Sequence, residues 1–355
     1  MILESIHEWI DGIGGPRSSL SVGPFGSIVT DVGKQRNENQ DRAGILRVVS
    51  STNGHGFICA ALCDGMGGHA HGAQAASIGL ANFFFTMVQE RKEFPERRLE
   101  RSVQAASAAI RKQYPQSGAT ISACLLEANR IVSLNVGDSR IYAFSSQTNA
   151  KRLKRLTVDD TMEEAFGSEG RGLLQYLGMQ GPIVPHIKTV EDMEVGGLLI
   201  TSDGAHMIGD NLIEQLHRGA KGKDELVSRI VDVSNWIGGV DNATAIFLDV
   251  AETQASLRGQ NNADVSIWSS SGQLKISWFG SAGPSHAQAP PAAPQSVRSD
   301  IPSTAKPPDQ AAQSTKSPAN TREADKTKPR KSRTGSTRRK KESQIIMGFG
   351  EDGEK

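Results

Sequence analysis

Residues 61–72 read "ALCDGMGGHAHG", and the interpretation of the whole chain depends on this stretch. An apolar run ends at Asp64, and a segment rich in glycine and histidine begins at Gly65. The apolar residues that follow are typical of a helix over 73–90. A strand, a glycine-rich loop and a helix in this order fit a phosphate-binding loop, a metal site or a tight turn.

The sequence "GMGGHA", residues 65–70, matches the G-x-G-x-x-A pattern of dinucleotide-binding loops. Asp64 would place an anion beside the pyrophosphate, and a second predicted helix over 96–113 follows where a βαβ unit requires a strand. A Walker loop is excluded, because the chain has no G-x-x-x-x-G-K-[ST] sequence. The nucleotide-binding interpretation is therefore disfavoured.

Five aspartates share one setting, at the margin of an apolar, strand-like run and beside a residue that permits a turn. They are Asp41, Asp64, Asp138, Asp203 and Asp241. Any one of them is adequately explained as a turn residue. Five together indicate strand ends that converge, and gathered carboxylates resist ionisation unless a cation joins them. Mg or Mn fits such oxygen ligands, whereas zinc fits poorly because no His/Cys ligand pattern accompanies them.

Two divalent ions a few ångström apart share a bridging water, make it hydroxide-like and offset charge on a phosphoryl group. Arg36 precedes Asp41 by five residues and is a candidate for gripping a phosphate in bidentate fashion. The alternative for a single arginine is a solvated surface position. The carboxylates and Arg36 together favour metal-assisted phosphate chemistry.

The predicted elements are a mixture of strands and helices. Strand-like runs include "GFICAALCD", "SACLLEA", "RIVSLNVGD", "GLLITSD" and "TAIFLDV", and helices are predicted over 73–90, 96–113 and 223–235. Two helices in succession break the βαβ alternation, so a doubly wound parallel sheet is disfavoured. Residues 1–21 begin with an amphipathic helix that either packs on the body or docks a partner or membrane surface. The Ser-Ser-Gly in residues 252–280 predicts a hairpin.

Residues 281–355 are rich in Pro, Ala, Ser, Thr and Lys, and most of this segment lacks large apolar residues. Such a composition predicts a disordered basic tail, with a short apolar motif, "QIIMGFG", near its end. The tail is either a solvated linker or a segment that binds a partner protein or an anionic surface. It lacks interleaved aromatics, so any nucleic-acid binding is expected to be nonspecific.

The ordered set of motifs resembles the metal-dependent PPM-type protein phosphatases, the protein phosphatase 2C family, in its bacterial form. The motifs that carry the resemblance span about residues 22–251 and are "GKQRNENQD", "LCDGMGGHAHGAQAAS", "SGATISACLL", "VGDSRIYAF", "LTVDD", "LLITSDGAHM" and "DNATAIFLDV". The resemblance implies a β-sandwich of two antiparallel sheets flanked by α-helices. It also implies a serine/threonine phosphatase that uses Mn or Mg.

Site roles follow from the same resemblance. Asp64 would bridge two ions and the Gly65 carbonyl would bind one of them. Asp203 and Asp241 would complete the second ion's ligands, and Asp41 would hold an ion or its water. Asp138 would bind a third, weaker ion together with Asp203. Arg36 would bind the substrate phosphate. A mobile flap would extend over about residues 157–190. Asp41, Asp64 and Arg36 are thus the candidate catalytic residues.

Four positions depart from the family motifs. Gln40 stands where many members carry an acid, Gln74 replaces a glutamate, and Asp160 replaces a histidine. Met66 stands where eukaryotic members carry a histidine proposed as general acid, so the leaving group would take its proton from water or another group. None of these changes removes a candidate metal ligand.

The expected function is hydrolysis of phosphoserine or phosphothreonine by direct attack of a water bridging two Mg/Mn ions. The alternative is a catalytically weak pseudophosphatase that binds phosphoprotein as a regulatory module. The three cysteines have no metal-like spacing, and no export signal or membrane span is evident. We therefore expect a cytoplasmic enzyme that acts on a phosphoprotein and opposes a Ser/Thr kinase.

Overall fold

Strand β4 (Phe57–Asp64) is buried on both faces, and this explains the uninterrupted apolar run that precedes Asp64. Ile58 and Leu62 belong to a core cluster between two sheets, whereas Cys59 and Cys63 pack toward helices on the opposite face. A strand covered on both sides needs apolar residues at every position. The computed structural model describes residues 2–12, 16–49, 56–66, 71–146, 153–167, 172–191, 194–258 and 264–277.

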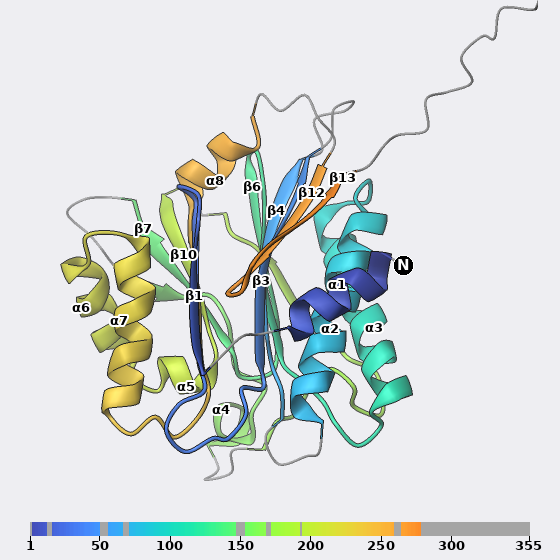
Figure 1. The fold of residues 1–355 in the computed structure, drawn as a ribbon, viewed down its shortest axis with the longest axis horizontal. Helices are drawn as coiled ribbons and strands as arrows, with labels where there is room; N and C mark the ends of the chain where they lie inside the picture. The colour runs from blue at the N-terminus through green and yellow to red at the C-terminus, as the bar shows by residue number, and fades with distance from the viewer. Residues whose placement is uncertain are drawn as a thin grey trace, which may run out of the picture. The chain divides into compact units, whose positions relative to one another are not determined.

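Two antiparallel sheets form the centre of the fold (Figure 1). The first has the order β1-β2-β11-β10-β7-β8, and the second has the order β13-β12-β3-β4-β5-β6-β9. The other strands are β1 (Arg17–Val22), β2 (Gly26–Asp31), β3 (Asp41–Val49), β5 (Ile121–Glu127), β6 (Arg130–Val136), β7 (Arg140–Ser145), β8 (Leu153–Arg155), β9 (His186–Thr189), β10 (Val195–Thr201), β11 (Ala243–Asp249), β12 (Asp264–Ser269) and β13 (Gly272–Ser277).

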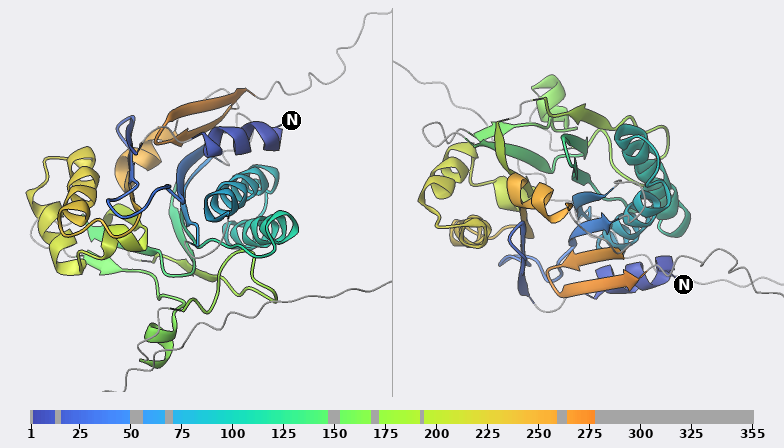
Figure 2. Two further views of the ribbon diagram at one scale, coloured as in Figure 1. Left: turned by 60° about the horizontal axis from the view of Figure 1, so that its bottom comes forward. Right: turned by 90° about the horizontal axis from the view of Figure 1, so that it is seen from above.

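Helices cover the outer face of each sheet, as Figures 1 and 2 show. They are α1 (Ile2–Asp11), α2 (Gly72–Gln89), α3 (Pro95–Gln113), α4 (Met162–Phe166), α5 (Asp203–His206), α6 (Asp210–Gly219), α7 (Lys223–Trp236) and α8 (Val250–Ser256). Helices α1, α2 and α3 share a core cluster with the second sheet, and α5, α6 and α7 share one with the first. The α+β sandwich expected from the sequence is confirmed.

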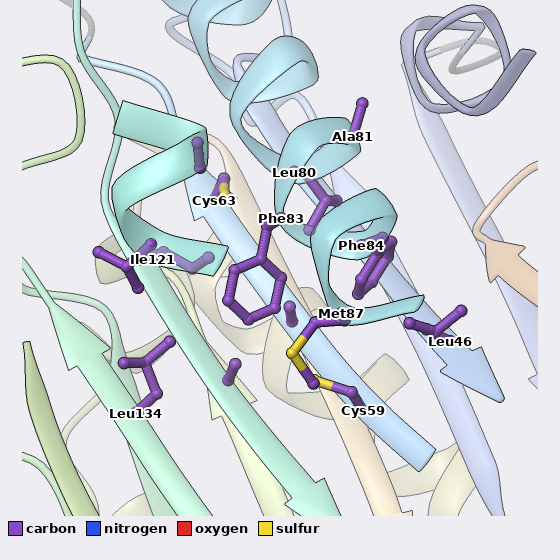
Figure 3. Packing of buried hydrophobic residues seen from close by; sticks show 14 of the residues in the cluster. Leu46, Cys59, Cys63, Leu80, Ala81, Phe83, Phe84, Met87, Ile121 and Leu134 are labelled. Atoms are coloured by element: carbon purple, nitrogen blue, oxygen red, sulfur yellow. The ribbon is translucent and has the colours of Figure 1, made fainter. Parts of the chain in front are cut away.

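Helix α2 supplies several of the large side chains of the core on its side of the sandwich (Figure 3). Phe83, Phe84 and Met87 are completely buried and lie over β3 and β4 near Leu46 and Cys59. Burial of each such side chain contributes about 1.5–3 kcal/mol to folding. This packing fixes α2 against β4, the strand that ends at Asp64.

Segments at both ends of the described chain belong to the sandwich. Ile6 and Ile10 of α1 are buried in the core, which agrees with packing on the body rather than with partner docking. The predicted hairpin is present as β12 and β13, and β12 pairs with β3. The expected tail, residues 281–355, lies outside the described residues. Within the described residues, no helix is both long and apolar enough to cross a bilayer.

Candidate active site

Asp41 and Asp64 face each other across two neighbouring strands. Asp41 is the first residue of β3, Asp64 is the last residue of β4, and the two are directly paired in the ladder. Asp41 is only 1% exposed, and neither carboxylate oxygen makes a well-formed hydrogen bond with the described residues. A buried carboxylate without partners is costly and needs either a proton or a cation.

The other three aspartates are electrostatically coupled to this pair. Asp203 follows β10 and opens α5, Asp241 precedes β11, and Asp138 lies between β6 and β7. Burial, and then the charges of Asp41, Asp203, Asp138 and Asp241, raise the pKa of Asp64 well above its usual value. The structure therefore brings the five candidate ligands to one end of the sandwich, as their positions at strand ends predicted.

Burial also raises the pKa of Asp41 and of Asp138 to about 7. For Asp41, the hydroxyls of Thr244 and Ser202 oppose this rise and the nearby carboxylates add to it. Burial raises the pKa of Asp203 too, with Asp241 as the next cause. Such perturbed acids in one place are typical of a functional site. No three acidic, histidine or cysteine side chains of the described segments already form a metal site.

Asn242 joins the two segments that carry Asp41 and Asp241. Its side-chain oxygen accepts a hydrogen bond from the Gln40 backbone at 2.8 Å, and its amide donates to the carbonyls of Val32 and Glu38. Asn242 belongs to the motif "DNATAIFLDV", but the sequence alone assigns it no role. Its position directly after a candidate ligand is the only local signal for this clamping function.

Thr120 was not singled out from the sequence, yet it fixes the backbone of Asp64. Its amide donates to the Asp64 carbonyl at 2.8 Å, and its hydroxyl accepts from the Asp64 amide at 3.0 Å. The same hydroxyl lies 2.8 Å from that of Ser139, beside Asp138. A hydroxyl directly before a mostly apolar strand was the available signal.

Gly65 occupies a position where no larger residue fits. A Cβ atom there would lie 2.3 Å from the Gly72 carbonyl oxygen and 3.0 Å from that of Gln40. Its amide donates to the Gln40 carbonyl, and the next amide, that of Met66, donates to Gly118. Close approach of the backbone explains this glycine. Gly67, Gly68 and His69 lie outside the described residues.

Arg36 is held at the same end of the fold by an ion pair with Asp241. One guanidinium nitrogen lies 2.6 Å from the Asp241 carboxylate, and the Arg36 side chain is 36% exposed. The preceding Gly33 has φ +79° and approaches the Asp241 carbonyl so closely that a Cβ atom would lie 2.3 Å from that oxygen. The guanidinium is thus both fixed and accessible to a phosphate.

Two further residues of the quoted motifs, His71 and Asp160, have other contacts within the described residues. His71 caps α2 with φ 73°, and its ring packs against Tyr114 at 5.2 Å. Asp160 accepts hydrogen bonds from the Gly137 amide and Gln175, and pairs with His186 at 2.7 Å. The expected flap is therefore bonded to the loop that carries Asp138.

Comparison with known proteins agrees with this fold and site. The sequence model of the protein phosphatase 2C family matches residues 34–241. The serine/threonine phosphatase stp of Listeria welshimeri is 24% identical over 244 residues, which cover 62% of this chain and 93% of that protein. The serine/threonine protein phosphatase PstP of Mycobacterium tuberculosis is 28% identical over 229 residues, which cover 58% of this chain and 43% of that protein.

A solved structure shows the same architecture. The PPM Ser-Thr phosphatase MsPP from Mycobacterium smegmatis is 26% identical, with a TM-score of 0.52 over 66% of this chain and 99% of that one. The fold and the family match define a PPM-type protein phosphatase. The chain belongs to the protein phosphatase 2C family.

Proposed function

We propose that this phosphatase hydrolyses phosphoserine and phosphothreonine in proteins with the help of two Mn or Mg ions at the aspartate cluster. The observation that carries the proposal is the buried Asp41 carboxylate, whose oxygens make no well-formed hydrogen bond within the described residues, directly opposite Asp64. Hard divalent cations bind such oxygens. Aspartates gathered in this way resist ionisation unless a cation joins them.

The proposed ligands are divided between the two ends of the site. Asp64 and the Gly65 carbonyl would hold ions on the β4 side, with Asp41 beside them. Asp203 and Asp241 would hold an ion on the other side, and Asp138 with Asp203 would serve a weaker third ion. Bound Mn or Mg would supply an acidified water for direct attack on phosphorus, and positive charge against the phosphoryl group.

The chain's own residues would orient and retain the substrate. Arg36 would exchange its contact with Asp241 for the phosphate and grip it by two N–H groups. Thr120 and Asn242 hold the backbones of Asp64 and Gln40, so the ligands keep their places as the substrate enters. Met66 offers no proton, so the leaving alkoxide would be protonated by water.

The test is turnover of a phosphothreonine peptide by the purified protein with and without Mn. We expect activity only with Mn, and we expect Asp203→Asn to lose it while remaining folded. Asp224→Asn removes an acid whose side chain is 54% exposed, and is the matched control. Binding of the phosphopeptide without any Mn-dependent turnover would favour the pseudophosphatase alternative and overturn the proposal.

The biological setting is part of the same proposal. A phosphoprotein substrate implies a serine/threonine kinase that this enzyme opposes, and the cytoplasm is the simplest compartment for both. The relatives named above are serine/threonine phosphatases, which supports this substrate class.

A further inference from the structure

Large apolar side chains are exposed beside two of the proposed metal ligands. Met207 follows Asp203 by four residues, and Trp236, Ile237 and Val240 precede Asp241. Trp236 is 82% exposed, the highest value for a large apolar residue in the described segments, and the other three are 42–45% exposed. We call these four residues the apolar rim. Large apolar side chains left exposed beside a functional site are candidates for binding a ligand.

Hydrogen bonds tie the rim to the site on both sides. Ser234, two residues before Trp236, donates to the Gly204 carbonyl at 2.5 Å, directly after Asp203. The Gly239 carbonyl accepts hydrogen bonds from the amides of Lys34 at 2.7 Å and Gln35 at 3.2 Å, in the segment that leads to Arg36. The rim is thus part of the same framework as the proposed phosphate-binding arginine.

The framework around the rim is closely packed. A Cβ atom on Gly239 would lie 2.9 Å from the Asn235 side-chain oxygen and 3.0 Å from the Lys34 amide nitrogen. A Cβ atom on Gly204 would lie 2.1 Å from the Asn242 carbonyl oxygen. The exposed side chains therefore stand on a preformed surface, which costs little ordering entropy when a ligand binds.

The fold itself does not require Trp236. Helix α7 buries one face through Leu226, Val227, Ile230 and Val231, and these residues share a cluster with the sheet. Trp236 ends the helix and points to solvent instead of joining this cluster. A large aromatic side chain kept in water beside a catalytic site has a binding role as its simplest physical explanation.

We propose that the apolar rim binds a large apolar side chain that lies close to the phosphorylated residue of the substrate. The proposal rests on the proposed function, because Arg36 would anchor the phosphate while the rim receives a neighbouring residue of the same peptide. An exposed phosphorylated segment reaches the site in extended form, so one side chain within about three residues spans roughly 10 Å. Preferred substrates would therefore be phosphopeptides with Leu, Ile, Met or Phe near the phosphoresidue.

The test compares phosphothreonine peptides that differ only by leucine or serine at each position from three before to three after the phosphothreonine. We expect kcat/KM to be about tenfold higher for the leucine peptide at one or more of these positions, through a lower KM. The free energy gained by burying one such side chain corresponds to about this factor in affinity. Trp236→Ala should abolish this preference and Trp236→Leu should retain much of it. Hydrolysis of a small aryl phosphate with Mn should be unchanged in both variants.

Phe94 provides the matched control, because it is 76% exposed in the turn between α2 and α3. Phe94→Ala should keep the full leucine preference. Equal rates for all peptides with the wild-type enzyme, or a preference that survives Trp236→Ala, would overturn the inference. So would sedimentation showing that Trp236→Ala separates a dimer without changing peptide selectivity. Absence of turnover even of the small ester would instead overturn the proposed function.

Discussion

One guanidinium nitrogen of Arg36 lies 2.6 Å from the Asp241 carboxylate, so the proposed phosphate ligand is paired with a proposed metal ligand. The contact joins residues that are 205 positions apart in sequence. It keeps Arg36 directed into the site before substrate arrives, and it offsets part of the negative charge of the aspartate cluster.

Replacement of Arg36 should therefore weaken substrate binding more than it weakens the fold. Charge-assisted hydrogen bonds contribute about 1.5–3 kcal/mol, so Arg36→Ala should raise KM for a phosphopeptide by about tenfold or more. Arg36→Lys should recover only part of this loss, because lysine lacks the planar fork. Arg17→Ala removes a surface arginine paired with Asp232 and is the control. An unchanged KM in Arg36→Ala would exclude a phosphate-binding role.

The pH dependence of stability should reveal the buried aspartates. Burial raises the pKa of Asp41 from 3.8 to about 7, so between these values the metal-free native state holds a proton that the unfolded chain has lost. The contribution of Asp41 to stability is consequently lost as pH rises through this window. The free energy of unfolding of Asp41→Asn should equal that of the wild type at pH 4. At pH 8 it should exceed the wild-type value by about a few kcal/mol.

The wild type has to be compared with Asp41→Asn because another group changes the pH dependence of stability in the opposite direction. Burial lowers the pKa of His206 well below its usual value, which favours the native state as pH rises toward 6.5. This contribution is common to wild type and Asp41→Asn and cancels in their difference. Thermal unfolding in EDTA at pH 4–8 measures the difference in stability between the two proteins. A difference that shrinks as pH rises would contradict the raised pKa of Asp41. Mn in place of EDTA should narrow the difference at pH 8, because it should stabilise the wild type more than Asp41→Asn.

The centre of the fold was accessible from the sequence because strands such as β4 and β5 are buried on both faces. Runs such as that of β4 have no polar interruption, and the glycines and aspartates at their ends mark where each strand stops. The short strands β8 and β9 escaped prediction, because three- and four-residue edge strands carry little hydrophobic pattern. Their place is set by pairing with β7 and β6 instead.

The site was only partly predictable, for a physical reason. The candidate metal-binding carboxylates lie at strand ends and therefore have a local sequence pattern. The residues that position these carboxylates are recognised only by their contacts with residues far away in the sequence. Thr120 contacts Asp64 across 56 positions, and Arg42 contacts Ser77 across 35. A single sequence contains no record of such pairs, so the supporting polar network was found only in three dimensions.

Gly65 gives a prediction about backbone space. Gly65→Ala would drive a Cβ atom to 2.3 Å from a backbone oxygen, and backbone atoms do not move aside cheaply. We expect a loss of about 3 kcal/mol or more of stability, or loss of Mn-dependent activity if the loop shifts instead. Gly222→Ala is the control, because it has extended backbone and no neighbouring atom within 4 Å. Equal thermal stability and activity of Gly65→Ala and wild type would contradict the proposed close approach.

Arg42 links the N-terminal helix to the backbone of a proposed metal ligand. Its side chain is almost fully buried, and one nitrogen donates to the carbonyls of Asn39 at 2.8 Å and Asp41 at 3.0 Å. Its Nε donates to the Ser77 hydroxyl, which in turn donates to Asp11 at the end of α1. Asp11 also lies 3.6 Å from the guanidinium, so a residue outside the family match at 34–241 balances this buried charge.

Loss of this link should weaken the binding of Mn at the proposed metal site. Arg42→Met should lower the affinity for Mn by about tenfold, since the Asp41 carbonyl loses its donor and the strand end gains freedom. Asp11→Asn should have a smaller effect in the same direction, and little further effect in the Arg42→Met background. Glu8→Gln removes another exposed acid of α1 and should leave Mn binding unchanged. Calorimetric Mn titration of the four variants measures the coupling, and additive effects of Asp11→Asn and Arg42→Met would show that Asp11 does not act through Arg42.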